Sequence, residues 1–199
     1  MRGMPGLTYR VATLADAGVV ADLHADSWRR HYRGAYADSF LDGDVVADRL
    51  QVWSERLANP QGTQTVVADD GAEAVGFVHT ILDADPTYGA LLDNLHVSAA
   101  HQRRGIGRQL MAASADFVLG ARPDSGLFLW VLEQNANAQA FYACLGGEAA
   151  DTKLVPPPSG IDGRLNGAPR GIRMVWPDPS ALARLGVVAG GEVGGVGRG

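Results

Sequence analysis

A turn rich in glycine and arginine, HQRRGIGRQL at His101–Leu110, separates two segments of different hydrophobic pattern. The residues before it, LLDNLHV, form an apolar run typical of a β-strand, and the residues after it, LMAASADFVL, repeat apolar positions at helical spacing. The chain is therefore predicted to pass from a strand into a helix through a glycine turn. Arginines crowd the start of that helix, although the helix dipole favours negative charge there. We therefore expect an anionic ligand at this turn.

The other segments alternate between strand and helix patterns. A strand is predicted over Leu7–Thr13, a helix capped by Asp16 follows it, and a second helix covers Ser39–Ala58. TQTVVAD and EAVGFVHTILDA flank DDGA as a hairpin, and the segments after the arginine turn indicate helix, strand, helix, strand and strand. The order β-α-α-β-β-β-α-β-α-β-β predicts an α/β (α+β) fold, with a mixed central sheet of about six to seven strands flanked by about four helices.

Length, charge and cysteine content limit the class of protein. A chain of 199 residues fits one domain, which we place at residues 7–178, with a disordered start at 1–6 and a flexible glycine-rich tail at 179–199. The net charge of −5 gives no footprint for nucleic acid or an anionic membrane, and no apolar run reaches the roughly 18 residues of a membrane span. Because Cys144 is the lone cysteine, no intramolecular disulfide can form, and a reducing cytoplasm is the expected compartment. The composition, rich in arginine, alanine and glycine, is typical of GC-rich bacterial genes.

Two common phosphate-binding loops do not fit the turn. A P-loop needs lysine and then serine or threonine after its second glycine, whereas arginine and glutamine follow Gly107. A dinucleotide fingerprint needs a third glycine where Leu110 stands. The remaining interpretation is a backbone cradle for a pyrophosphate at a helix start, with an ordinary turn and solvated arginines as the alternative. Its charge would come from Arg103, Arg104 and Arg108.

The turn and a second segment resemble the two signatures of the GNAT superfamily of acetyl-CoA-dependent N-acetyltransferases. The first signature is a strand, a linker and then Gln or Arg, two residues, Gly, one residue and Gly or Ala, which Gln102–Gly107 matches position by position. The second segment, NANAQAFYACLGGE, matches the family's asparagine at Asn135, its Phe-Tyr pair at Phe141–Tyr142 and its glycine at Gly146. The aromatic residue that usually follows that glycine is replaced by Gly147. The resemblance covers residues 7–176.

This resemblance implies that acetyl-CoA is the co-substrate and that no metal takes part. The pantetheine arm would pair with backbone groups of the strand before the turn, like an added strand, at Leu95, His96 and Val97. The histidines of the chain show no metal spacing such as HExxH. The two signatures further imply cofactor binding by Gln102, Arg103, Arg104, Gly105, Ile106, Gly107, Arg108, Asn135 and Tyr142.

The resemblance also implies direct attack of a neutral primary amine on the thioester, with a main-chain N–H near Val97 as oxyanion donor. Tyr142 is the implied general acid, because a phenol of pKa ~10 can protonate a thiolate of pKa ~8.5 when it lies close. Asp93, expected on the same strand face as Val97, and Glu133 at the end of the next strand are alternative bases. An amine that arrives deprotonated needs neither. His96 is expected to point away from Val97 and to pack.

The acceptor is the open question. Trp28, Tyr32 and Tyr36 lie near one another on or after the first helix, where they either pack in the core or wall an acceptor pocket. A small-molecule amine is favoured over a protein N-terminus or lysine, since no long charged tract suits peptide docking. A non-catalytic acyl-CoA sensor is the alternative from another class, and it would tolerate loss of Tyr142. Homodimers are common in the family, and no sequence feature specifies one.

Overall fold

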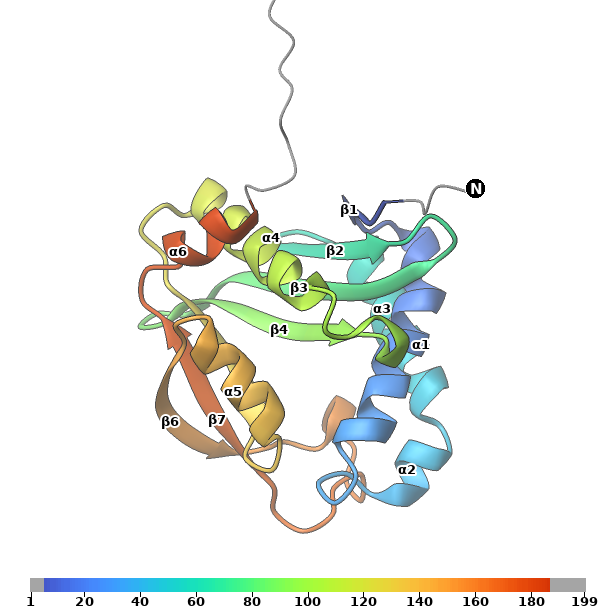
Figure 1. The fold of residues 1–199 in the computed structure, drawn as a ribbon. Helices are drawn as coiled ribbons and strands as arrows, with labels where there is room; N and C mark the ends of the chain where they lie inside the picture. The colour runs from blue at the N-terminus through green and yellow to red at the C-terminus, as the bar shows by residue number, and fades with distance from the viewer. Residues whose placement is uncertain (1–5, 187–199) are drawn as a thin grey trace, which may run out of the picture.

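The computed structural model describes residues 6–186, which form one seven-stranded sheet with helices on both faces (Figure 1). The strands lie in the order β1-β2-β3-β4-β5-β7-β6. Neighbouring strands are antiparallel except β4 and β5, which are parallel, so the sheet is mixed as expected. Their bounds are β1 Thr8–Val11, β2 Thr63–Asp69, β3 Ala74–Asp85, β4 Gly89–Val97, β5 Leu127–Leu132, β6 Glu148–Leu154 and β7 Arg170–Trp176.

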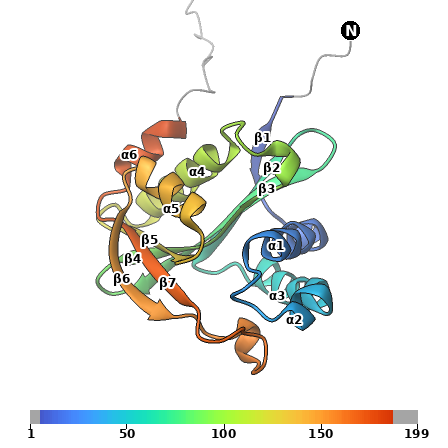
Figure 2. The same ribbon diagram turned by 60° about the horizontal axis from the view of Figure 1, so that its bottom comes forward.

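The helices divide into two layers. Helices α1 (Ala17–His31), α2 (Asp38–Asp42) and α3 (Val45–Ala58) lie on one side of the sheet, and α4 (Ile106–Ala121), α5 (Ala136–Cys144) and α6 (Ser180–Ala183) lie on the other (Figure 2). Trp53 and Phe77 are fully buried beneath the first layer, and Leu110 and Leu129 are buried beneath the second. No helix among residues 6–186 is both long and apolar enough to cross a bilayer.

The predicted order of strands and helices is confirmed, with one division that the sequence pattern did not indicate. The helix predicted over Ser39–Ala58 is two helices, α2 and α3, which meet at Gly43. A Cβ at Gly43 would lie 2.7 Å from the carbonyl oxygen of Ser39, so the chain makes a close backbone approach there that only glycine allows. Helical spacing continues across this break, which is why periodicity alone merged the two helices.

The boundary predicted at residue 178 lies too early. Residues 180–186 form α6 and a 3₁₀ turn, and Leu182 is fully buried in the core beneath α4. Gln109 of α4 also donates a hydrogen bond to the carbonyl oxygen of Leu185 at 3.2 Å. The prediction relied on the glycine-rich composition of the C-terminal residues and overlooked Leu182 and Leu185, which pack against the core. The remaining parts of the predicted disordered start and flexible tail, residues 1–5 and 187–199, lie outside the described residues.

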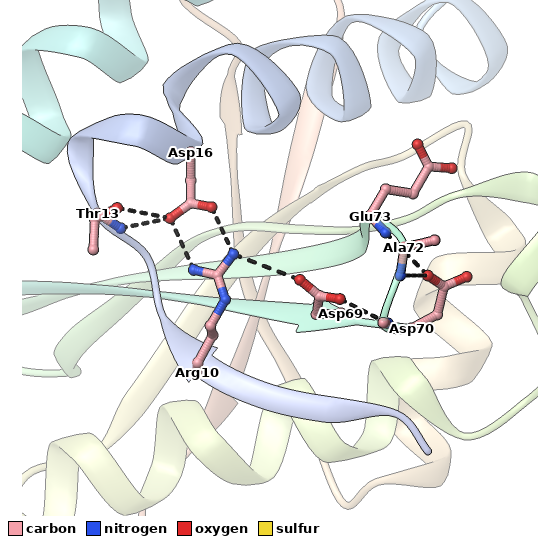
Figure 3. Close-up of polar contacts among 8 residues, drawn as sticks. Arg10, Thr13, Asp16, Asp69, Asp70, Ala72 and Glu73 are labelled. Carbon is pink, nitrogen blue, oxygen red and sulfur yellow. Dashed lines mark hydrogen bonds and ion pairs between the residues drawn. The ribbon is translucent and has the colours of Figure 1, made fainter. Parts of the chain in front are cut away.

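A polar cluster joins β1, the start of α1 and the β2–β3 hairpin (Figure 3). Arg10 donates two hydrogen bonds to the carboxylate of Asp16, at 2.9 and 2.7 Å, and lies 3.6 Å from Asp69. The backbone N–H of Thr13 donates to Asp16 at 2.7 Å. Asp16 occupies the N-cap position of α1 as predicted, but its side chain makes no capping hydrogen bond, because its oxygens accept from Arg10 and Thr13. The Arg10 guanidinium lowers the pKa of Asp16 to about 2.

Candidate active site

The two central strands separate along their length. β4 and β5 pair only at Ala90 with Leu127 and at Leu91 with Phe128. β5 then continues along β7 as far as Leu132, whereas β4 continues along β3 as far as Val97. A cavity of about 440 Å³ occupies the opening, bounded by the later halves of both strands, the arginine turn and α5. We call it the turn-side cavity.

The edge of β4 that faces this cavity has backbone groups that do not pair with β3. Ser98 donates to the carbonyl oxygen of Val75 at 2.8 Å, so in the antiparallel register His96 also directs its N–H and C=O toward β3. By alternation, Leu95 and Val97 direct theirs toward the opening. The prediction that Leu95 and Val97 offer backbone hydrogen bonds there fits this geometry. The same prediction for the backbone of His96 is wrong, because its groups belong to the β3 ladder.

The arginine turn has an unusual backbone. Arg103 (φ +61°) and Gly105 (φ +82°) both adopt the left-handed conformation, and α4 begins at Ile106. The first N–H groups of a helix have no partner within it, so those from Gly105 to Arg108 are free to bind a ligand at this end of the cavity. Within residues 6–186, no carboxylate forms an ion pair with Arg103, Arg104 or Arg108.

Hydrogen bonds and close packing hold the turn in place. Ser98 and His101 share a hydrogen bond at 2.8 Å, and Gln102 donates to the carbonyl oxygen of Val97 at 3.5 Å. A Cβ at Gly107 would lie 3.3 Å from the ring of Phe141, so this glycine lets α5 pack against the start of α4. The two signature segments therefore meet at one side of the cavity.

The second signature segment builds the cavity wall from α5. Asn135 caps this helix by accepting a hydrogen bond from the N–H of Ala138 at 3.2 Å, and both residues line the cavity. Gly147, at the position of the missing aromatic, leaves room for Trp176, because a Cβ there would lie 2.6 Å from the indole ring. Trp176 donates to the carbonyl oxygen of Leu145 at 3.0 Å. An aromatic residue from β7 thus fills the space beside α5.

Tyr142 lines the same cavity from α5. Burial, and secondly the neighbouring Tyr32, raise the pKa of its hydroxyl well above the usual range. The phenol is therefore protonated over the whole physiological range. No hydrogen bond joins this hydroxyl to another group of residues 6–186, so it is available as a donor.

A β-bulge changes the predicted orientation of Asp93. In the β3–β4 register His79 faces Asn94 and Thr80 faces Leu92, so Asp93 has no partner of its own. Leu92 packs in the α4-side core, and Leu95 and Val97 pack against it. The extra residue shifts the alternation, and Asp93 faces α3 on the opposite side, where Arg56 donates to it at 2.6 Å. The expectation that Asp93 shares the face of Leu95 and Val97 is wrong.

A second cavity, of about 590 Å³, lies on the α1–α3 side of the sheet. We call it the helix-side cavity. Trp28, Tyr32 and Tyr36 all line it, and Trp28 and Tyr36 are also buried in a core cluster. That these residues bind the acceptor stays a prediction. Six residues line both cavities: Tyr32, Asp93, Asn94, Trp130, Val131 and Leu132. The two cavities therefore meet at the bulge of β4 and the second half of β5.

Glu133, the other predicted base, lies apart from this junction. Its side chain is exposed just beyond β5 and lines neither cavity, and its backbone N–H donates to Arg170 at 2.9 Å. Tyr32 at the junction has a pKa raised to about 12 by burial and by Asp93. Of the three residues predicted to be catalytic, Asp93 lies at the junction, Tyr142 lines the turn-side cavity, and Glu133 lines neither cavity.

The histidines near the junction are neutral packing residues. His96 packs against His24 with ring centroids 4.7 Å apart, as expected for a side chain directed away from Val97, and burial lowers its pKa to about 3. Trp53 donates to Nδ1 of His24 at 3.0 Å, and burial lowers the pKa of His24 far below the usual range. Among residues 6–186, no group of three or more His, Cys, Asp or Glu residues could hold a metal ion.

Sequence reasoning missed four cationic residues of the helix-side cavity, Arg49, Arg56, Lys153 and Arg173, and one carboxylate, Asp85. The four cationic residues come from α3, β6 and β7, which are far apart in the chain. The sequence offered one weak signal, since Lys153 is the only lysine among many arginines. Cys144 is exposed on α5.

The fold, the separated strands and the arginine turn agree with a known family. The sequence profile of the Acetyltransferase (GNAT) family matches residues 22–146, and the chain belongs to this family. It is 29% identical over 181 residues to the uncharacterized N-acetyltransferase YuaI of Bacillus subtilis, covering 90% of this chain and 98% of that protein. It is 28% identical over 138 residues to the probable N-acetyltransferase Rv2775 of Mycobacterium tuberculosis, covering 67% of this chain and 75% of that protein.

One solved structure with the same fold contains coenzyme A. The PaiA N-acetyltransferase of Thermoplasma acidophilum, in complex with coenzyme A, superposes with a TM-score of 0.66 at 16% identity. The match covers 86% of this chain and 99% of that one. At this level of identity the similarity establishes the shared fold.

Proposed function

We propose that this protein is an N-acetyltransferase that moves the acetyl group of acetyl-CoA to a primary amine by direct attack. The observation that carries the proposal is the opening between β4 and β5, which is lined on one side by backbone groups of β4 that do not pair with β3 and ends at the arginine turn. An extended pantetheine arm needs such an edge, and a pyrophosphate needs such a turn. Family membership supports the same interpretation.

The turn suits a pyrophosphate for two independent reasons. The helix start and the left-handed residues Arg103 and Gly105 direct N–H groups to one place, and the surrounding arginines have no carboxylate partners among the described residues. Charge-assisted hydrogen bonds from backbone and guanidinium groups together would hold the phosphate oxygens. This arrangement explains why cations lie at a helix start where the dipole alone would favour anions.

The chemistry needs three events at the junction of the two cavities. The amine nitrogen forms a bond to the thioester carbonyl carbon, the carbon–sulfur bond breaks, and one proton passes from the nitrogen while the sulfur gains one. The N–H of Val97 points toward the opening and would donate to the carbonyl oxygen as its negative charge develops. Tyr142 would donate a hydrogen bond to the departing thiolate, which takes its proton from solvent.

The raised pKa of Tyr142 defines its part in this scheme. A phenol less acidic than usual does not transfer its proton fully to a thiolate of pKa ~8.5, since each unit of difference costs about 1.4 kcal/mol. It remains a protonated hydrogen-bond donor, which stabilises the thiolate as it forms. Asp93 would take the amine proton from the helix-side cavity, directly or through water, with Arg56 fixing the position of its carboxylate.

Two measurements test this proposal. Calorimetric titration with acetyl-CoA should show one binding site. Its affinity should fall as the salt concentration rises, because the bound phosphates interact with cations of the protein. A thiol-release assay with a panel of amines should then show CoA production that depends on both substrates. Absence of acetyl-CoA binding would overturn the proposal. Binding without thiol release from any amine would instead favour a sensor that binds acyl-CoA without transfer.

A further inference from the structure

More cationic than anionic side chains line the helix-side cavity. Four cationic side chains line it against two carboxylates, Asp85 and Asp93. If the acceptor were a simple ammonium ion, this balance of charged side chains would be unexpected in its binding cavity. The positive side chains would repel the ammonium group as it entered. A cation in this cavity that has no carboxylate partner would therefore indicate what charge the acceptor carries.

Each arginine of this cavity has a carboxylate partner. Arg56 pairs with Asp93 at 2.6 Å, and Arg49 pairs with Asp48 at 2.5 Å. Arg173 lies between Asp85 at 2.9 Å and Asp151 at 2.8 Å. These guanidinium groups are neutralised and held in place by the protein itself.

Lys153 is the exception. Within residues 6–186 no carboxylate forms an ion pair with it. Its ammonium group lies 4.1 Å from the centroid of the Trp130 ring, and the guanidinium carbon of Arg173 lies 4.6 Å from the same ring. Burial, followed by the charge of Arg173, lowers the pKa of Lys153, and the smaller opposing effects of Asp93 and Asp151 do not cancel this shift. An anion bound here would relieve that repulsion.

Resting on the proposed function, we propose that the acceptor amine carries a carboxylate and that Lys153 binds this carboxylate. Trp130 lies at the junction of the two cavities and also contacts Lys153, so one ring separates the lysine from the place where the amine reacts. The acceptor is therefore compact, with amine and carboxylate a few bonds apart, as in an amino acid. The aromatic wall of Trp28 and Tyr36 lies in the same cavity and suits its side chain.

The first test uses matched acceptors and matched variants. The probes are the twenty L-amino acids and their carboxamides, with spermidine as an amine that has no carboxylate. We expect turnover with at least one amino acid and a KM at least tenfold higher for its carboxamide. Lys153→Met keeps the apolar stem over Trp130 and should raise the KM for the amino acid about tenfold or more, with the KM for acetyl-CoA unchanged, since the charged hydrogen bond to the carboxylate is lost.

Two further variants separate charge from packing. Lys153→Arg keeps the charge and should restore most of the affinity for the amino acid. Arg170→Met removes a neighbouring cation on β7 that lines neither cavity, and it should change nothing. Faster acetylation of spermidine or of carboxamides than of amino acids, or an equal effect of Lys153→Met on acids and carboxamides, would overturn the inference.

The second test does not depend on turnover. Because the sequence has one lysine, protein labelled with ¹³C-lysine gives a single side-chain signal set whose titration reports the pKa of Lys153. With CoA bound in place of acetyl-CoA, an amino acid should raise that pKa and its carboxamide should not. No change with any amino acid overturns the inference. Acetyl-CoA binding, measured separately by calorimetry, shows whether the proposed function itself has failed.

Discussion

The two cavities are built from different materials. The turn-side cavity presents backbone groups of β4 and of the α4 start, positioned by strand separation and by two left-handed residues. The helix-side cavity presents side chains from α1, α3, β5, β6 and β7, most of them aromatic or charged. Backbone groups are the same in every sequence that folds this way, whereas side chains are not. The first cavity therefore suits a co-substrate common to a family, and the second suits an acceptor particular to one protein.

The junction should be the most sensitive point of the molecule, because both cavities depend on it. Tyr142→Phe removes the hydroxyl that would stabilise the leaving thiolate while it keeps the buried ring. We expect kcat to fall about 100-fold, with the affinity for acetyl-CoA unchanged. Stopped-flow thiol release together with calorimetry measures both quantities. An unchanged kcat would remove Tyr142 from the chemistry and leave it as a packing residue.

Gly105→Val tests the turn-side cavity alone. A β-branched residue at φ +82° is strained by roughly 2 kcal/mol, so we expect acetyl-CoA affinity to fall about 30-fold. The KM of the acceptor should stay the same, because no part of the helix-side cavity touches this turn. Gly120→Val is the matched control, since Gly120 lies in α4 with open space around it. Equal losses in the two variants would mean that the fold, rather than the turn, was damaged.

The contrast between backbone and side chains also explains which parts could be predicted from the sequence. The turn at Gln102–Gly107 is local, so its spacing located it, and the resemblance to the second family signature located Asn135. The orientation of Asp93 depends on a bulge, and a single extra residue reverses the alternation on which the prediction relied. Lys153 reaches the cavity only because β6 pairs with β7 at the far edge of the sheet. No pattern within its own segment carries that information.

Asp93 and Glu133 are the two predicted bases, and they can be compared because Asp93 lies at the junction and Glu133 lies outside both cavities. Asp93→Asn removes the carboxylate at the bulge, and we expect kcat/KM at pH 7 to fall about tenfold. The deficit should shrink near pH 9, where more of the free amine is already deprotonated. Glu133→Gln should have no effect, because its side chain lines neither cavity. Loss of activity in Glu133→Gln with normal Asp93→Asn would reverse the assignment of the base.

A change remote from both cavities should leave binding intact and alter stability alone. Asp16 at the Arg10 cluster has a pKa of about 2, below its usual value of 3.8, so the folded state favours its charged form. This contribution is fully present above about pH 4 and is lost as the pH falls toward 2. Asp16→Asn should lower the free energy of unfolding at pH 7 by about 1–2 kcal/mol, a figure reduced because Arg10 is 45% exposed. Urea denaturation at pH 7 and pH 2.5 measures the difference, which should narrow at the lower pH, while KM for both substrates stays at the wild-type value. A shift in either KM would show that the Arg10–Asp16 cluster affects substrate binding. The cluster could then no longer be treated as separate from the two cavities.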